Sequence, residues 1–208
     1  MCPRLVAYRE EIAAEEPSWF NGAVESFAPE GGAKETRLLI IGLAPGRTGA
    51  NRTGRPFTGD WAGDLLYGSL LKQGLASGIY GKRPDDGLTL NRTMITNAVR
   101  CVPPANKPVG AEINQCRPFL SRRIETLPEL RTMLCLGKIS HDSTLRALGQ
   151  KISAMPFGHD TDYLIEYEGR RLRLRSSYHC SRYNTSTKRL TEEMFDAVVA
   201  KCAADIAD

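Results

Sequence analysis

The chain has 208 residues, of which 41% are hydrophobic and 25% are charged. These proportions are typical of a soluble globular protein, and we expect residues 1–208 to form a single domain. The formal net charge of +4 permits a nucleic-acid partner without requiring one. The sequence lacks a run of eighteen apolar residues and the pattern of a signal peptide, so we expect a cytoplasmic protein without membrane segments. We also expect a monomer. The six cysteines are then not expected to form disulfides.

Apolar spacing predicts helices and strands in alternation along the chain. Residues 2–16 predict a short surface helix, and residues 17–36, rich in Gly, Pro, Ser and Asn, predict an irregular connection. The remaining expected elements are a strand at 38–42, a helix at 60–74, a strand at 93–99, a helix at 110–127, a strand at 132–136, a helix at 137–148, a hairpin of 163–167 with 171–174, and a helix at 191–204.

This alternation predicts an α/β fold, a three-layer sandwich in which helices flank a central, mostly parallel sheet with right-handed crossovers. Ligands of such sheets bind beyond the carboxyl ends of the strands. The loops that follow Gly42, Asn97 and Ser177 should therefore converge at one edge. His141, on the helix at 137–148, is expected to be a solvated surface residue.

The loop after the first strand belongs to the segment 38–60, LLIIGLAPGRTGANRTGRPFTGD. Its prolines and glycines exclude a helix, and the small glycines let backbone amides approach a ligand closely. Long loops inside compact domains are usually functional, so we predict a ligand-binding loop. Asp60 closes it at the start of the next helix, where a carboxylate also suits an N-cap.

The three loops together offer a carboxylate, an aromatic ring, amides, an imidazole and several cations. These are the groups needed to handle a nucleobase within a phosphate chain. The predicted base-binding residues are Gly42, Ala44, Pro45, Gly46, Asn51, Phe57, Asn97 and Asn184, and the predicted DNA-binding residues are Arg47, Arg52, Arg55, Arg182, Tyr183, Lys188 and Arg189.

Three stretches, GLAPGRTGANRTGRPFTGD, ITNAVRCVPPANKP and SYHCSRYNTSTKRLT, resemble the signature motifs of family 5, or type B, uracil-DNA glycosylases. CPRLVAYREE resembles the opening of the same family, so the resemblance covers nearly the whole chain. It implies a base excision repair enzyme that flips a deaminated base out of DNA and hydrolyses its N-glycosidic bond, which leaves an abasic site. It also implies a parallel sheet of four strands and, as partner, DNA containing uracil or other deaminated bases.

By position in these motifs, Asp60 matches the water-activating carboxylate, and His179 opens the last motif. The chemistry agrees, because bond cleavage leaves an electron-poor sugar near Asp60 and an anionic base. His179, as a neutral donor or a cation, would bind the charge on uracil O2, unless it only satisfies a strand end. Phe57 would stack on the base, unless it is a core residue. Arg182 and Tyr183 would enter the duplex, or form a solvated turn.

Asn97 is the residue expected to read the base. Its amide presents a donor beside an acceptor, which complements uracil O4 and N3–H when the amide is held in one orientation. The alternative is a strand-end Asn that caps the next turn. Family 5 members, as the resemblance has it, often act on several deaminated bases, whereas the Thr96–Asn97 pair resembles the family 4 pattern.

The same resemblance implies a four-iron four-sulfur cluster. Cys2, Cys101 and Cys116 match three of the family's four ligand positions, and the residue matching the fourth is not identified in this chain. The sequence given omits an upstream cysteine, or the cluster has three protein ligands, or it has been lost; we expect a cluster. Cys135 and Cys202 are interpreted as core residues, and the role of Cys180 stays open.

Two other functions remain possible. A DNA-binding protein that has lost catalysis would keep the arginines and Phe57 but would not need Asp60. A small-molecule enzyme could use GLAPGRTG to bind phosphate, although Gly42, Gly46 and Gly49 do not form GxGxxG.

Overall fold

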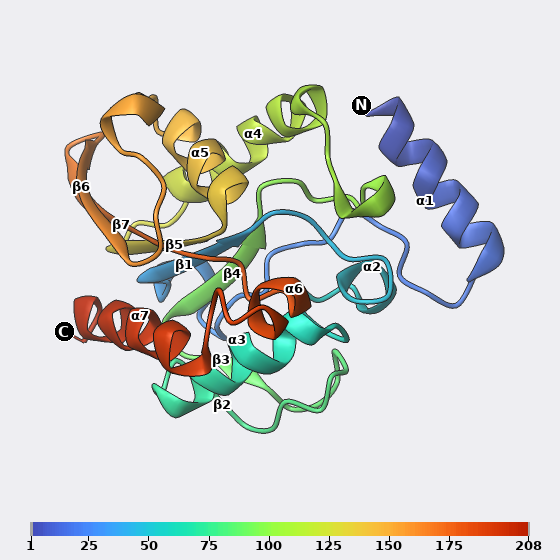
Figure 1. Cartoon of the computed structure of the whole chain (residues 1–208), viewed down its shortest axis with the longest axis horizontal. Coiled ribbons are helices and arrows are strands. Elements are labelled where there is room, and N and C mark those ends of the chain that lie inside the picture. The colour runs from blue at the N-terminus through green and yellow to red at the C-terminus, as the bar shows by residue number, and fades with distance from the viewer. Residues whose placement is uncertain (1, 208) are drawn as a thin grey trace.

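The computed structural model describes residues 2–207 and is built around one five-stranded sheet with the order β4-β1-β5-β7-β6 (Figure 1). Four strands are parallel neighbours: β4 (Thr93–Asn97), β1 (Leu38–Gly42), β5 (Thr132–Leu136) and β7 (Arg170–Ser177). β6 (Thr161–Tyr167) pairs antiparallel with β7 at the edge. The four parallel strands that the resemblance implies are therefore present. The whole sheet has five strands rather than four, because the predicted hairpin adds β6 at its edge.

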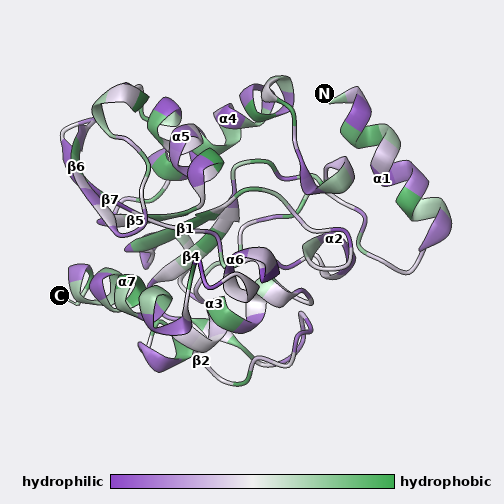
Figure 2. Ribbon diagram, viewed as in Figure 1, coloured by the Kyte–Doolittle hydropathy of each residue, from purple (hydrophilic) through white to green (hydrophobic). Residues whose placement is uncertain are grey.

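Alternate residues of the buried strands supply two separate cores. Leu38 and Ile40 of β1 face one hydrophobic cluster, whereas Leu39 and Ile41 face the other, and all four are fully buried. This explains the continuous apolar run in the sequence, because a strand covered on both faces needs no polar side. The hydropathy colours of Figure 2 show the same green centre.

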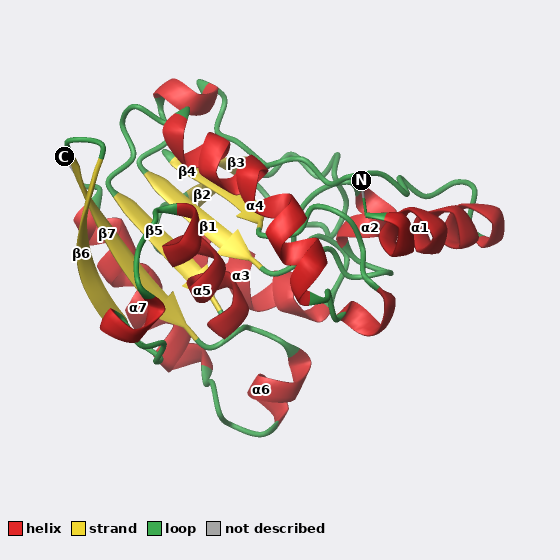
Figure 3. Cartoon of the chain, turned by 90° about the horizontal axis from the view of Figure 1, so that it is seen from above, coloured by secondary structure: helices red, strands yellow, loops and turns green. Residues whose placement is uncertain are grey.

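Helices cover both faces of the sheet, as the views in Figures 1 and 3 show. α3 (Trp61–Lys72) and α7 (Glu192–Asp205) pack on one face, and α4 (Gly110–Glu125) and α5 (Lys138–Ala147) on the other. The remaining elements are α1 (Pro3–Glu15), α2 (Ala50–Thr53), α6 (Arg182–Ser186), the 3-10 turns Gly32–Lys34, Pro104–Asn106 and Ile152–Ala154, and the short ladder of β2 (Ala76–Ser77) and β3 (Thr89–Leu90). The exclusion of any helix from 38–60 is therefore wrong for one turn, α2, which lies between Gly49 and Gly54. No helix among residues 2–207 is long and apolar enough to cross a membrane.

His141 is buried, which contradicts its predicted place on the solvated surface. Its Nδ1 lies 2.7 Å from Ser176 Oγ, and its Nε2 lies 2.8 Å from the Met155 carbonyl oxygen. A histidine with both ring nitrogens satisfied is tolerated in a core. Periodicity alone missed it because His141 is polar but lies on the helix face that packs against β7.

Candidate active site

The three loops converge as predicted at the carboxyl edge of the sheet, where they enclose a cavity of about 390 Å³. The loop after β1, the loop after β4 and the segment after β7 all contribute walls. The lining residues are Leu43, Ala44, Gly46, Ala50, Phe57, Asp60, Trp61, Ala62, Asn97, Asn106, His179, Ser181 and Arg182.

Asp60 lies at the junction of the first loop and α3. It is the N-cap of α3, because its side chain accepts a hydrogen bond from the Gly63 N–H at 3.3 Å. Burial raises the pKa of the Asp60 carboxyl above its usual range, while hydrogen bonds from the Gly63 and Ala62 backbone oppose the shift and Asp64 adds to it. The predicted cap is confirmed, and the same carboxylate also faces the cavity.

Two glycines of the loop make room for this carboxylate. A β-carbon added at Gly49 would lie 2.4 Å from Asp60 Oδ2, and one added at Gly46 would lie 3.2 Å from it. The first distance is shorter than any ordinary contact. Gly49 is thus required by the position of the Asp60 side chain, and not only by the turn of the backbone.

His179 follows β7 and packs against Phe57, with ring centroids 5.9 Å apart. Burial lowers the pKa of His179 to about 4. The imidazole is therefore neutral at physiological pH, which decides between the two protonation states that the sequence left open. Asn184 Nδ2 donates to the His179 carbonyl oxygen at 2.8 Å and so fixes the backbone of this residue.

Asn97 ends β4, directly beside Gly42 at the end of β1. A β-carbon at Gly42 would lie 2.4 Å from Asn97 Oδ1 and 2.6 Å from Phe57 Cζ, so only glycine admits both side chains. The Asn97 side chain is 7% exposed and lines the cavity. Within residues 2–207 it makes no hydrogen bond of its own, which leaves its amide available to a ligand.

Several predicted site residues do not reach the cavity. Asn51 is fully buried, and its Nδ2 donates to Asn21 Oδ1 at 3.0 Å. Gly42, Pro45 and Asn184 are not among the residues that line the cavity. The prediction that Arg55 binds DNA is wrong. Its side chain is 6% exposed and forms an ion pair with Asp86 at 2.7 Å, so its guanidinium is not available to a DNA phosphate.

The other predicted cations are exposed, and one of them lines the cavity. Arg182 lines the mouth, and its guanidinium lies 5.6 Å from the centre of the Trp61 ring. Tyr183, beside it on α6, is 72% exposed. Arg47 is paired with Glu15, and Arg189 lies over the Tyr178 ring. Arg52 and Lys188 are also exposed.

Sequence reasoning missed part of the wall. Asn106 was overlooked because its loop showed only prolines and polar residues, although Ala105 and Asn106 both have positive φ, at 53° and 55°. Trp61 was assigned only to a helix, yet it is 52% exposed and its Nε1 donates to Thr185 Oγ1 at 3.0 Å. An exposed tryptophan one residue after a candidate catalytic carboxylate was the available signal.

A second cavity, of about 410 Å³, contains the three cysteines that the sequence grouped together. Cys2, Cys101 and Cys116 all line it, and burial raises the pKa of Cys101 and of Cys116. Arg9 lines the same cavity, and its buried Nε has no hydrogen-bond partner within residues 2–207. Among these residues, no group of three or more His, Cys, Asp or Glu side chains is placed so that it could hold a metal ion. The three thiols and the unpaired Arg9 Nε therefore share one cavity.

An open α/β sheet whose carboxyl edge holds a base-sized cavity with a carboxylate and an imidazole is the arrangement of a base-processing enzyme. Residues 29–203 match the family model described as the Uracil DNA glycosylase superfamily. The chain is 44% identical over 201 residues to the type-5 uracil-DNA glycosylase of Thermus thermophilus, covering 94% of this chain and 88% of the relative.

Two further relatives show how the similarity is distributed. The type-5 uracil-DNA glycosylase of Pyrobaculum aerophilum is 35% identical over 208 residues, covering 98% of this chain and 87% of the relative. The type-4 uracil-DNA glycosylase of Sulfurisphaera tokodaii is 28% identical over 173 residues, covering 82% and 72%. The chain therefore belongs to the uracil-DNA glycosylase superfamily and, within it, to the type-5 branch.

Proposed function

We propose that the protein removes uracil, together with other deaminated bases that the cavity admits, from DNA by hydrolysing the N-glycosidic bond, which leaves an abasic site. One observation carries this proposal: the half-buried carboxylate of Asp60 and the neutral imidazole of His179 line the same cavity. The cavity also has an aromatic wall at Phe57 and an amide at Asn97. The names and similarity of the type-5 relatives support the same activity.

In this reaction the bond between C1′ of the sugar and N1 of the base breaks, and the electron pair leaves with the base. Asp60 orients water towards C1′ and accepts its proton as the new C–O bond forms. Its negative charge also stabilises the cationic sugar in the transition state. A pKa raised by burial makes the ionised Asp60 carboxylate a stronger base.

His179 supplies the complementary interaction at the base. A neutral imidazole N–H donates a hydrogen bond to uracil O2, where negative charge develops as the bond breaks. Since the cavity keeps the pKa of His179 at about 4, the imidazole gives this bond without delivering a proton. Phe57 and Asn97 provide one apolar face and one polar edge for the extruded base.

We further propose that Cys2, Cys101 and Cys116 supply three of the four ligands of an iron–sulfur cluster of the 4Fe-4S type, whose fourth ligand is not identified in this chain. The cluster would supply a structural anchor and no redox step. The shared cavity, the three thiols and the unpaired Arg9 Nε support this proposal. Ala44 packs with these cysteines and also lines the base cavity. A cluster here would therefore hold the wall of the active site.

The activity is tested with a labelled duplex containing one uracil, incubated with the protein and then treated with alkali. Strand cleavage at the uracil is expected, because alkali breaks the chain at an abasic site. A shifted band in a native gel without cleavage would instead indicate a DNA-binding protein. If the protein neither cleaved the duplex nor shifted its band, DNA would be excluded as the substrate.

The cluster is tested separately by iron analysis and visible absorption of anaerobically purified protein. Yellow-brown protein is expected, with iron that is lost in Cys101→Ser and Cys116→Ser but retained in the core variant Cys202→Ser. Colourless, folded wild-type protein without iron would contradict the cluster.

A further inference from the structure

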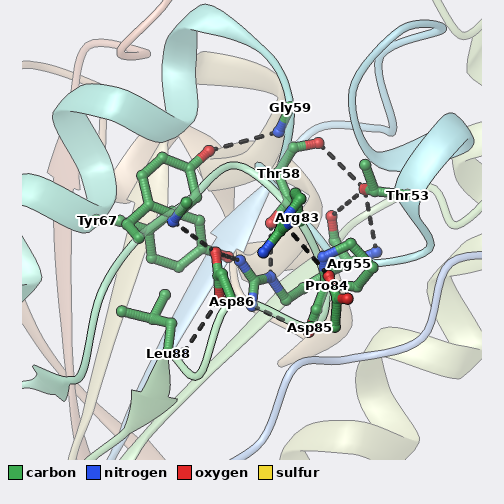
Figure 4. A network of polar contacts seen from close by, with 12 residues as sticks. Thr53, Arg55, Thr58, Gly59, Tyr67, Arg83, Pro84, Asp85, Asp86 and Leu88 are labelled. Atoms are coloured by element: carbon green, nitrogen blue, oxygen red, sulfur yellow. Dashed lines mark hydrogen bonds and ion pairs between the residues drawn. The ribbon is translucent and has the colours of Figure 1, made fainter.

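Arg55 and Asp86 form an ion pair that is buried beside the active-site loop (Figure 4). Arg55 Nη1 and Nη2 donate to the two carboxylate oxygens of Asp86 at 2.8 and 2.7 Å, and the side chains are 6% and 2% exposed. The pair is thus a fork-to-fork contact from which water is almost excluded. The mechanism makes no direct use of either side chain.

Asp86 comes from the exposed turn between β2 and β3, but its side chain points inward. It accepts hydrogen bonds from the N–H groups of Gly81 and Leu88 at 2.8 and 3.1 Å. Burial alone would raise the pKa of Asp86, but Arg55 and these N–H groups hold it well below its usual range. The carboxylate is therefore ionised and fully engaged, so the turn is closed around it.

Arg55 transmits this anchor to the loop of the active site. Its Nε donates to Thr58 Oγ1 at 2.8 Å, and the Thr58 N–H donates to the Arg55 carbonyl oxygen at 3.2 Å. These two bonds close a tight turn with Phe57 inside it. Phe57 has a φ of 54°, which is an uncommon conformation for a bulky residue and persists only where the surroundings impose it.

Two tyrosines hold the rest of the turn. Tyr67 Oη donates to the Pro56 carbonyl oxygen at 2.6 Å, and Tyr80 Oη donates to the Phe57 carbonyl oxygen at 3.1 Å. Both rings also pack against the Arg55 guanidinium, which lies 5.6 and 6.0 Å from their centres. The guanidinium therefore contacts both tyrosines and Thr58, which together hold the backbone of residues 55–59. Asp60 is the next residue in the chain.

We propose that Arg55 and Asp86 are positioning residues for the reaction. Their buried ion pair fixes the turn at residues 55–58, and this turn holds Phe57 against His179 and places Asp60 at the cavity. This inference rests on the proposed glycosylase activity and adds two residues to it. Neither residue touches the base. Their loss is expected to lower the rate of excision while leaving DNA affinity largely intact, because a small displacement of reacting groups lowers rate steeply.

A remote ion pair provides the matched control. Arg175 donates to Asp205 at 2.6 and 3.0 Å, with the side chains 8% and 10% exposed, and Thr132 at the start of β5 lies within hydrogen-bond reach of Asp205. This pair lies towards the opposite edge of the sheet from the cavity. Asp205 also pairs with Arg173 at 2.9 Å, so Asp205→Asn disturbs at least as many ion-pair contacts as Asp86→Asn, but away from the active site.

The experiment compares melting temperature, single-turnover excision of uracil, and affinity for an abasic duplex, all below the melting temperature of each variant. Both single variants should melt lower. Excision should fall roughly tenfold to a hundredfold in Asp86→Asn, with abasic-DNA affinity within about threefold, and should stay within about twofold in Asp205→Asn.

The double variant Arg55→Met, Asp86→Leu separates positioning from stability. Replacing both partners of a buried ion pair by apolar side chains leaves no unpaired charge, so this protein should melt above Asp86→Asn, although the Gly81 and Leu88 N–H groups lose their acceptor. It lacks the Arg55 bond to Thr58, and its excision should remain low. Recovery of excision together with stability would overturn the proposal, as would wild-type excision in Asp86→Asn.

The His179 imidazole gives a readout that does not depend on activity. The chain has three histidines, so their NMR signals can be assigned by substitution. The His179 signal should shift in Asp86→Asn and in the double variant, because the Phe57 ring beside it moves, but not in Asp205→Asn. An unchanged signal would contradict the positioning role. If wild-type protein failed to excise uracil, the proposed function would fail, and this signal would still report whether the pair fixes Phe57.

Discussion

The imidazole of His179 stacks on the ring of Phe57, with centroids 5.9 Å apart and planes inclined by 27°. Stacked aromatic pairs have centroids about 4.5–7 Å apart, so a base inserted between these rings would require roughly twice that spacing. An extruded base must therefore pack beside the pair. Phe57 thus has two tasks, as part of the wall of the base cavity and as the cover that keeps water from His179.

The second task predicts a pKa change in Phe57→Ala. Burial is the cause of the low pKa of His179, about 4, and water stabilises the charged imidazole. Removing the ring should therefore move this pKa upward, towards the ordinary value of 6.5. An NMR titration of His179 measures the change, and Phe57→Leu, which keeps an apolar cover, should retain the low value. An unmoved pKa in Phe57→Ala would mean that other groups exclude the water.

Gly49→Ala is predicted to damage catalysis through Asp60. The added β-carbon would lie 2.4 Å from Asp60 Oδ2, so the carboxylate must move. Excision should fall by roughly tenfold or more. The control is Gly68→Ala, since a β-carbon at Gly68 in α3 meets no atom within 4 Å and should stabilise the helix by about 0.5–1 kcal/mol. Equal excision by both variants would show that Asp60 tolerates displacement.

The exposed cations of the three loops predict salt-dependent binding. Arg52→Ala and Arg182→Ala should each weaken DNA affinity on all sequences, and the removal of one phosphate-binding cation should flatten the plot of log affinity against log salt by about one unit. Arg171→Ala, at an exposed position of β7 in the β6–β7 hairpin, is the control and should leave the slope unchanged. Slopes that match wild type in all three variants would place the DNA elsewhere.

Asn97→Ala is predicted to change the choice of base. A well-formed pair of hydrogen bonds discriminates by about 1–3 kcal/mol, so uracil excision should fall roughly tenfold to a hundredfold. Excision of hypoxanthine or xanthine, if the enzyme performs it, should fall less. Single-turnover cleavage of duplexes carrying each base measures this. An equal loss on every base would assign Asn97 a structural role, and no loss on uracil would exclude it from base recognition.

The sequence predicted the elements that local patterns specify. The buried strands, the N-cap at Asp60 and the convergence of three loops followed from apolar runs, turn residues and the polarity of parallel sheets. The sequence predicted β6 as one strand of a hairpin with β7. It did not show that the hairpin joins the main sheet, because this depends on the pairing of β7 with β5, two strands that are distant in the sequence.

Side-chain direction was not predictable in the same way. Arg55 and Arg52 are both arginines of one glycine-rich loop, yet Arg55 is buried and Arg52 is exposed. The difference arises from Asp86, which lies 31 residues after Arg55 in a turn that the sequence alone did not connect to the loop. The contact of Asn51 was not predictable for the same reason, because its partner Asn21 lies in the irregular N-terminal connection.

The central claim is that Asp60 activates water for cleavage of the N-glycosidic bond. The direct test is single-turnover excision from a uracil duplex by wild type and Asp60→Asn. Asparagine keeps an oxygen that accepts the Gly63 N–H hydrogen bond, but it lacks the carboxylate that acts as general base. Excision should fall by on the order of a hundredfold or more while DNA affinity stays the same or rises. Wild-type excision should also fall with decreasing pH through the raised pKa of Asp60, because the protonated carboxyl accepts no proton. Undiminished excision by Asp60→Asn would contradict the account.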